Sequence, residues 1–539
     1  MALGHVDALA YISAKIMADD EERKKRAAAA EKRVASYYLK EKYSDSESSS
    51  NREELQYVLS CLKYTVKDYR DEECEEDWKV VSNCDLKPRV EDIKVLVKRA
   101  ISNHYSAVKD NVDDANIYAN CLHLFSKDYK CEIIENPGGA LSWNYPVNII
   151  VPMGLPENPN QLDSYSWEPE VFRDGKFQEY KEMLSQAPIA RCRNRFPVPV
   201  ILCGEKYICR SGTLAVRKSA AYEALTQTRE PESKEVPEGA LSQFWDGVKT
   251  VAKRSKASIV NFYNALDMLL NVEMDDIKEL DVRVLELLSI EFICDLMVEN
   301  RKIHTGLSVG SSEKINLRKY GKFKILKIPY PGCGFFARYS EAGRNGKNLV
   351  YDWDMPEVDA SLGMAADEEE NFKLIEDVNW QLYVNWDLLE LTKNYMKLLL
   401  SYATDNRSDG LLVHCISGWD RTPLFICLLR LSLWADGFIH TSLDAVEMAY
   451  LTLGYDWYLF GHDLPARLKN SEEILHFCFN FIPELASQEY CMRKGSAKDK
   501  HNLVKRRDLL CEVSSLVLKF YEDRIRMERG TPDRAVSRK

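Results

Sequence analysis

Residues 411–431 read LLVHCISGWDRTPLFICLLRL, and this stretch decides the fold. An apolar run ends at His414, a short loop rich in reactive and charged residues follows, and a second apolar run begins at Pro423. The pattern predicts a buried strand that leads through a tight loop into a buried helix. Pro423 suits the first turn of that helix, because its missing N–H would have no hydrogen-bond partner there.

Other segments extend this pattern into an α/β domain. Runs of β-branched residues bounded by proline predict strands in NYPVNIIVP (144–152) and NRFPVPVILC (194–203). Further strands are expected at 290–297 and 323–328, and helices interleave with them, as at 388–402. Because strands and helices alternate along the chain, we predict an α/β sheet.

Composition narrows the class of protein. With 84 Asp and Glu against 73 Lys and Arg, the net charge is −11, which argues against general nucleic-acid binding. Acidic residues such as Asp7 interrupt the start, so no signal peptide is expected, and no apolar run approaches the length of a membrane span. The fifteen cysteines form no C-x-x-C pair, and the few histidines show no ligand spacing. We therefore expect a soluble cytoplasmic protein with reduced thiols and neither metal nor other cofactor.

The loop between the predicted strand and helix has the residues of a phosphate site. It lies at the carboxyl end of a strand and the amino end of a helix, where open α/β sheets bind ligands. Its backbone N–H groups can curl around one anion, helped by the helix dipole. The same field favours a nucleophilic thiolate at Cys415, and Arg421 offers a planar fork to phosphate oxygens. The candidate phosphate-binding loop comprises Ile416, Ser417, Gly418, Trp419, Asp420, Arg421 and Thr422, of which Thr422 would assist the departing thiolate.

The C-x-x-x-x-x-R spacing alone is weak evidence in a chain with this many cysteines and arginines. The alternative is that Cys415 is a core thiol and Arg421 a surface charge. The strand, the glycine, the arginine and the helix-starting proline in register favour the phosphate site. Cys427, inside the apolar helix, is expected to pack rather than react.

His414 to Pro423 resembles the active-site loop of the myotubularin family of phosphoinositide 3-phosphatases, H-C-S-D-G-W-D-R-T. Residues 144–152, ARCRNRFPVPV (190–200) and DWYLFGHDLPARL (456–468) also resemble elements of that family, so the likeness covers roughly 140–480. IPYPGC (328–333), LLRLSLWADG (428–437) and the FGH segment are most similar to its divergent Jumpy branch. The resemblance implies a cysteine-dependent phosphatase fold, with a central mixed sheet flanked by helices.

Two departures from the family pattern bear on substrate and recruitment. Ile416 and Ser417 stand where the family has Ser and Asp, which removes one loop carboxylate and leaves the preference between mono- and bisphosphorylated lipids open. The lipid-binding domain that precedes most myotubularin phosphatase domains is not recognisable. We expect membrane recruitment to work differently.

Four regions are predicted along the chain. Residues 1–52 form a charged helical arm (10–39) and a Ser-rich linker (44–52), and residues 53–139 are mostly helical. The phosphatase-like domain spans 140–490, with a flexible insertion near 229–239, and a basic tail follows at 491–539.

The reaction needs a proton donor for the leaving group. Asp420 matches the family's loop aspartate and is the first candidate, although it could instead brace the loop. Asp387 is the alternative general acid, and it is equally well placed as the N-cap of the helix that follows. Asp354 and Asp359 are weaker candidates.

An anionic headgroup at a membrane surface calls for a cationic rim. Arg191, Arg193 and Arg195 alternate along a run that would place them on one face of a strand, and Lys206 and Arg210 follow. Solvated surface charge is the alternative. The basic tail could likewise meet anionic lipids or be disordered.

The resemblance implies removal of the 3-phosphate from phosphatidylinositol 3-phosphate and the 3,5-bisphosphate, through a cysteinyl-phosphate, by a protein recruited peripherally to membranes. A protein tyrosine or dual-specificity phosphatase is the second hypothesis. A catalytically weak scaffold is the third, although both Cys415 and Arg421 are present. Protein partners cannot be named from the sequence.

Overall fold

The computed structural model describes residues 87–109, 111–154, 172, 175–184, 190–215, 274–299, 302–304, 307–309, 313, 317–363, 375–404, 409–492 and 499–530. Nearly all of them belong to one compact unit, made of Cys84–Ala220, Ile277–Lys302 and Ser308–Lys539. The predicted arm (10–39), linker (44–52) and insertion (229–239) lie outside the described residues.

A five-stranded mixed sheet lies at the centre of this unit, in the order β3-β4-β9-β5-β8. β3 pairs antiparallel with β4, and all other neighbours are parallel. The strands are β3 (Val198–Cys203), β4 (Lys206–Gly212), β5 (Ile290–Asp295), β8 (Lys324–Lys327) and β9 (Gly410–Cys415). Every residue of the central β9 is buried, as expected for a strand paired on both edges and covered on both faces.

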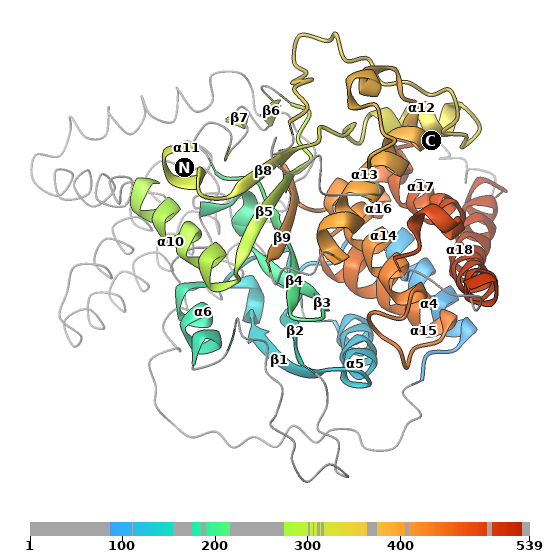
Figure 1. Cartoon of the computed structure of the whole chain (residues 1–539). Coiled ribbons are helices and arrows are strands. Elements are labelled where there is room, and N and C mark those ends of the chain that lie inside the picture. Colours follow the sequence, from blue (N-terminus) through green and yellow to red (C-terminus); the bar gives the residue numbers. More distant parts are fainter. Residues whose placement is uncertain are drawn as a thin grey trace, which may run out of the picture. The chain divides into compact units, whose positions relative to one another are not determined.

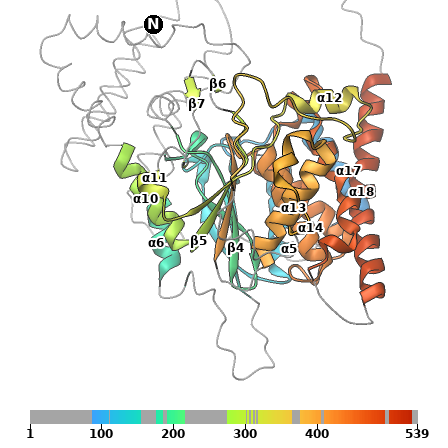
Figure 2. The ribbon, with the colours of Figure 1, turned by 45° about the horizontal axis from the view of Figure 1, so that its top comes forward.

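Helices cover both faces of the sheet, as Figure 2 shows. On one face lie α13 (Leu388–Thr404) and α14 (Arg421–Ala435); on the other lie α6 (Lys176–Leu184), α10 (Met274–Leu287) and α11 (Leu317–Tyr320). α14 is buried from Arg421 to Trp434, because it packs between the sheet and the helices that follow it in sequence. The fold is therefore the α/β arrangement with a central mixed sheet flanked by helices that the sequence predicts.

The first described segments of the chain pack into the same core. They are α4 (Val90–Ser102), α5 (Val112–Ser126), β1 (Lys130–Glu135), the 3-10 turn η1 (Pro137–Gly139) and β2 (Asn148–Gly154), which pairs antiparallel with β1. The apolar face of α4, with Ile93, Leu96, Val97 and Ile101, is buried as its helical spacing predicts.

The C-terminal part is helical. It comprises α15 (Ala445–Leu451), the π-helix η6 (Thr452–Leu459), α16 (Leu464–Lys469), α17 (Ile474–Phe481), the 3-10 turns η7 (Ile482–Ala486) and η8 (Gln488–Tyr490), and α18 (Asp499–Gly530). Figure 1 shows α18, in red, beside the N-terminal α4, in blue. Arg506 of α18 is buried against Asp436, with its Nη1 2.7 Å from Oδ1. The tail residues 499–530 thus form a helix, which excludes disorder for them, one of the two alternatives left open for the basic tail.

The remaining elements are short. They are the 3-10 turn η4 (Cys192–Asn194), the paired strands β6 (Lys302–His304) and β7 (Leu307–Val309), α12 (Phe335–Glu341) and the 3-10 helix η5 (Trp380–Asn385). Within the part of the chain that the structure describes, every helix is too short or too polar to cross a bilayer.

Candidate active site

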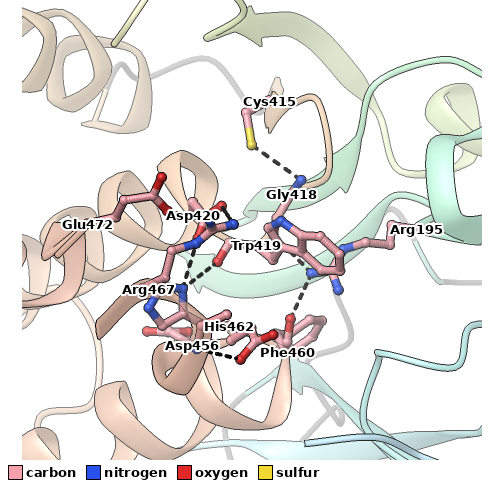
Figure 3. Close-up of polar contacts among 12 residues, drawn as sticks. Arg195, Cys415, Gly418, Trp419, Asp420, Asp456, Phe460, His462, Arg467 and Glu472 are labelled. Carbon is pink, nitrogen blue, oxygen red and sulfur yellow. Dashed lines mark hydrogen bonds and ion pairs between the residues drawn. The ribbon is translucent and has the colours of Figure 1, made fainter. Parts of the chain in front are cut away.

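The loop between β9 and α14 holds Cys415 at its base. The strand ends at Cys415 and the helix starts at Arg421, so the loop joins a strand's carboxyl end to a helix's amino end, as predicted. The N–H of Gly418 donates a hydrogen bond to Cys415 Sγ at 3.2 Å (Figure 3). The backbone therefore turns back over the sulfur, as a phosphate cradle requires.

Gly418 is required for this turn. Its φ is +69°, in the left-handed region that side chains with a Cβ disfavour. A Cβ at this position would lie 2.4 Å from the carbonyl O of Ser211 on β4, which is rigid backbone. The loop can approach the neighbouring strand this closely only because residue 418 is glycine.

Two buried arginines hold the loop from below. Arg195 Nη2 and Arg210 Nη2 each donate a hydrogen bond of 2.9 Å to the carbonyl O of Gly418. Arg195 also binds the carbonyl O of Phe460 at 2.9 Å (Figure 3), and Arg210 binds that of Asp456 at 2.7 Å. Burial lowers the pKa of Arg195 to about 9 and that of Arg210 to about 10, so both remain charged at neutral pH. These bonds fix the orientation of the Gly418 carbonyl. The two arginines also add positive charge next to the loop that is expected to bind phosphate.

The Cys415 thiol is poised to ionise. Burial alone would raise its pKa, but the charge of Arg421 and hydrogen bonding with Thr422 outweigh burial, so the pKa of Cys415 is lowered from the ordinary value. Since the thiolate is the nucleophilic form, this environment favours attack at neutral pH.

Arg421 is fixed by Glu299, which sequence reasoning missed. Its Nη1 and Nη2 lie 3.0 and 2.9 Å from the two carboxylate oxygens of Glu299, a bidentate pair. Nη1 also donates to the carbonyl oxygens of Leu296 and Tyr330. Glu299 follows β5, the strand beside β9, so a carboxylate after a neighbouring parallel strand was the signal available in the sequence.

The carboxylate of Asp420 is bound by two residues of the segment that follows the π-helix η6. Arg467 donates to its two carboxylate oxygens at 3.1 and 2.9 Å, and His462 Nδ1 lies 3.0 Å from Oδ1 (Figure 3). His462 Nδ1 is also 3.0 Å from the carbonyl O of Trp419; because both partners accept, Nδ1 carries the proton. Burial would raise the pKa of Asp420, but Arg467 and His462 lower it well below its usual range. Asp420 is thus an ion-paired carboxylate in this structure.

Two of the other candidate acids accept hydrogen bonds from backbone N–H groups, and the third is exposed. Asp387 accepts the N–H groups of Glu390 and Asn348 at 2.9 and 2.8 Å, so it caps α13 as its alternative interpretation predicted. Asp359 accepts the N–H of Ser361, and Asp354 is exposed.

The alternating arginines do not form a strand face, and this prediction is wrong. Cys192–Asn194 is a 3-10 turn in which Arg193 has φ +58°. Arg191 and Arg195 are fully buried, so neither is exposed for contact with a membrane surface. Arg193 alone is partly exposed, and it lies over the ring of Trp419 at 4.2 Å from the centroid. Lys206 and Arg210, also expected in the rim, are buried in β4.

Arg191 instead belongs to a buried network of charged side chains that reaches the residue before Cys415. It binds Asp281 of α10 through Nε and Nη2 at 2.8 and 2.7 Å, and its Nη1 binds Glu313 at 2.6 Å. Glu313 also lies 3.3 Å from Nε2 of His414, the residue before Cys415. Burial disfavours the charged imidazole, but Glu313 raises the pKa of His414. This network of buried charged side chains connects His414 of β9 with Asp281 of α10.

Among the described residues, no group of three or more His, Cys, Asp or Glu side chains is arranged to hold a metal ion. The site as described consists of a thiol, backbone N–H groups and arginines. These groups suit covalent transfer of a phosphoryl group to sulfur.

A cysteine-dependent phosphatase of the C-x-x-x-x-x-R type is the class that this fold and loop define. No family model matches the chain. The phosphatidylinositol-3,5-bisphosphate 3-phosphatase MTMR14 of Mus musculus is 38% identical to it over 392 residues, which are 71% of this chain and 55% of the relative. The Homo sapiens protein of the same name is 39% identical over 383 residues, 70% of this chain and 54% of the relative. The chain is thus similar to myotubularin-related phosphatases over about 70% of its length, and it spans about half the length of these curated relatives.

Proposed function

We propose that the chain is a phosphoinositide 3-phosphatase that hydrolyses phosphatidylinositol 3-phosphate and phosphatidylinositol 3,5-bisphosphate. The observation that carries this proposal is the loop that turns the Gly418 N–H onto Cys415 Sγ, at 3.2 Å, and ends at Arg421. Both relatives are named phosphatidylinositol-3,5-bisphosphate 3-phosphatases, which supports the 3,5-bisphosphate as a substrate. No cofactor takes part in the proposed reaction.

In the first step the Cys415 thiolate attacks the phosphorus of the 3-phosphate. An S–P bond forms, the P–O bond to the inositol breaks, and the departing alkoxide takes up a proton. The loop N–H groups and Arg421 bind the non-bridging oxygens, and they bind more strongly as charge shifts onto these oxygens in the transition state. Glu299 keeps the Arg421 fork in register for two of them.

In the second step water attacks the cysteinyl-phosphate, the S–P bond breaks, and inorganic phosphate leaves. The thiolate departs more easily if its charge is stabilised. The buried hydroxyl of Thr422 lowers the pKa of Cys415 and donates to no other group among the described residues, so it is available to the sulfur.

Asp420 is the proposed proton donor for the alkoxide. It is the carboxylate of the loop itself, and Asp387 is occupied as a helix cap. Since Arg467 keeps Asp420 ionised, donation requires that substrate binding separates this pair and that Asp420 then takes up a proton, from solvent or from a protonated oxygen of the arriving phosphate, which it passes to the alkoxide. Replacement by asparagine decides between donation and bracing, because only a poor leaving group needs the proton. Asp420→Asn should impair lipid hydrolysis much more than hydrolysis of an activated aryl phosphate. An equal loss on both substrates would assign Asp420 to bracing of the loop through Arg467 and His462.

Membrane contact follows from the proposed substrate. A phosphoinositide headgroup is displayed at a bilayer surface, so we infer that the protein acts in the cytoplasm and is recruited peripherally. The substrate-trapping variant Cys415→Ser should co-sediment with vesicles that contain phosphatidylinositol 3-phosphate and less with vesicles of neutral lipid.

Phosphate release from a panel of substrates tests the activity. The panel contains the seven phosphorylated inositol lipids and a phosphotyrosine peptide, and we expect the two 3-phosphorylated lipids named above to be preferred. Cys415→Ser should abolish release, because a hydroxyl there stays protonated. Arg421→Lys should be nearly as damaging, since an ammonium cannot replace the planar fork. Preference for the phosphotyrosine peptide would refute the lipid assignment and leave the cysteine mechanism standing.

A further inference from the structure

Arg193 projects from a turn that is anchored on both sides. Arg193 and Asn194 have φ values of +58° and +52°, consecutive left-handed residues that are not glycine. Such conformations are strained for residues with a side chain and persist only where the surroundings impose them. Here the flanking Arg191 is held by Asp281 and Glu313, and Arg195 by the Gly418 and Phe460 carbonyls. The two buried arginines fix the turn, and the turn presents the third.

The Arg193 guanidinium lies at the rim of the phosphate cradle. Its Nη1 donates a hydrogen bond to the hydroxyl of Ser417, and its Cζ is 4.2 Å from the centroid of the Trp419 ring. These two loop residues flank Gly418, whose N–H meets Cys415 Sγ. On its other side Trp419 packs edge-on against Trp143, with centroids 6.3 Å apart. Arg193 therefore stands beside the phosphate position without being part of the cradle.

Arg193 is placed to meet an anion that arrives with the substrate. Its contacts with Ser417 and Trp419 attach it to the loop that holds the attacked phosphate. A guanidinium can bind a phosphoryl group through two parallel N–H bonds. Stacking on Trp419 keeps the planar group oriented and restricts its rotamers.

We propose that Arg193 is a specificity-determining residue, which binds a second phosphoryl group of the substrate besides the phosphate attacked by Cys415. This inference rests on the proposed function. A 3-phosphorylated phosphoinositide can offer two such groups: the phosphodiester that joins the ring to glycerol, and the 5-phosphate of the bisphosphate. Both are anionic phosphoryl groups on the same ring, and the substrates distinguish them.

The test compares kcat/KM for three soluble substrates. These are short-chain phosphatidylinositol 3-phosphate, short-chain phosphatidylinositol 3,5-bisphosphate and para-nitrophenyl phosphate, which has no second phosphoryl group. In Arg193→Gln the ratio of lipid to aryl phosphate should fall roughly ten- to a hundredfold, the usual worth of a hydrogen-bonded charge, mainly through KM. A fall for both lipids identifies the phosphodiester, and a fall for the bisphosphate alone identifies the 5-phosphate. Arg193→Lys, which keeps the charge, should lie between the wild type and Arg193→Gln.

Lys181→Gln is the matched control. Lys181 on α6 is also a half-exposed cation over an aromatic ring, with Nζ 5.0 Å from the Phe177 centroid, and its loss should leave the ratios unchanged. An unchanged ratio in Arg193→Gln, or a loss of equal size on all three substrates, refutes the assignment of Arg193 and leaves the proposed function standing. A wild-type chain that cleaves the aryl phosphate and neither lipid refutes the proposed function and this assignment with it.

Discussion

Thr422 and Arg421 set the charge of Cys415 at the scale of single residues. Replacing Thr422 by valine removes the hydroxyl and keeps the shape, so the pKa of Cys415 should rise. The pH dependence of inactivation by iodoacetamide measures this pKa. In the wild type the inflection should lie below the value of about 8.5 of a free cysteine, and in Thr422→Val it should move to higher pH. An unmoved inflection would show that the hydroxyl does not act on the sulfur.

Glu299 is a positioning residue that acts through Arg421. Glu299→Gln keeps the shape but weakens the bidentate pair of 2.9 and 3.0 Å, so the fork loses its register. We expect kcat to fall roughly tenfold or more on every substrate, including an aryl phosphate, because all of them use Arg421.

A double variant tests whether Glu299 acts on catalysis through Arg421. In an Arg421→Lys background the fork is already lost, so Glu299→Gln should cost little more. Full additivity of the two losses would mean that Glu299 acts elsewhere.

Single residues also show which parts of the site could not be predicted from the sequence. Cys415, Gly418 and Arg421 were found because the motif is contiguous. Glu299 and Glu313 were not, because their partners Arg421 and His414 lie about a hundred residues away in sequence. Glu299 meets Arg421 through the parallel pairing of β5 with β9, and Glu313 meets His414 only in the folded chain. The prediction for ARCRNR (190–195) was wrong for a related reason. The period-2 spacing suggests one face of a strand, whereas Arg191 and Arg195 have their hydrogen-bond partners inside the protein.

At the scale of elements, the turn at Gly418 joins a strand, a loop and a helix. Gly418→Ala would place a Cβ 2.4 Å from Ser211 O and force a φ of +69° on a residue with a side chain. The loop must then shift away from β4, so aryl phosphate hydrolysis should be lost and the melting temperature should fall. Gly334→Ala is the control, since Gly334 has open space around its Cβ position and should change neither quantity. Retained activity in Gly418→Ala would mean that the loop tolerates another path.

Most strands of the sheet could be predicted, and β4 could not. β3, β5, β8 and β9 lie where the sequence predicted strands, and α13 and α14 begin at or within two residues of the expected positions. β4 reads KYICRSG, with a lysine, an arginine and a serine, and such residues normally argue against a buried strand. It is buried because Lys206 binds the Tyr402 carbonyl and Arg210 binds those of Gly418 and Asp456. These compensating partners cannot be read from the strand itself.

At the scale of the whole molecule, α18 completes the hydrophobic core. Leu510, Val513, Val517 and Tyr521 of this helix are buried, each worth about 1.5–3 kcal/mol. Deletion of residues 493–539 would expose their partners and leave Asp436 without Arg506. Because a domain is stable by only about 5–15 kcal/mol, we expect the shortened chain to be insoluble or to melt far below the full chain. Deletion of 531–539 alone removes none of these contacts and should leave the melting temperature unchanged.

The order of the strands has a consequence for biosynthesis. β9, the last strand of the sheet in sequence, occupies its centre between β4 and β5. Until the ribosome has released residue 415, the β3-β4 and β5-β8 pairs each keep an open edge where β9 will later pair, and open edges invite association with other chains. The nucleophile is therefore delivered by the same strand that closes the sheet, and a nascent chain carries no assembled cradle before its scaffold is complete.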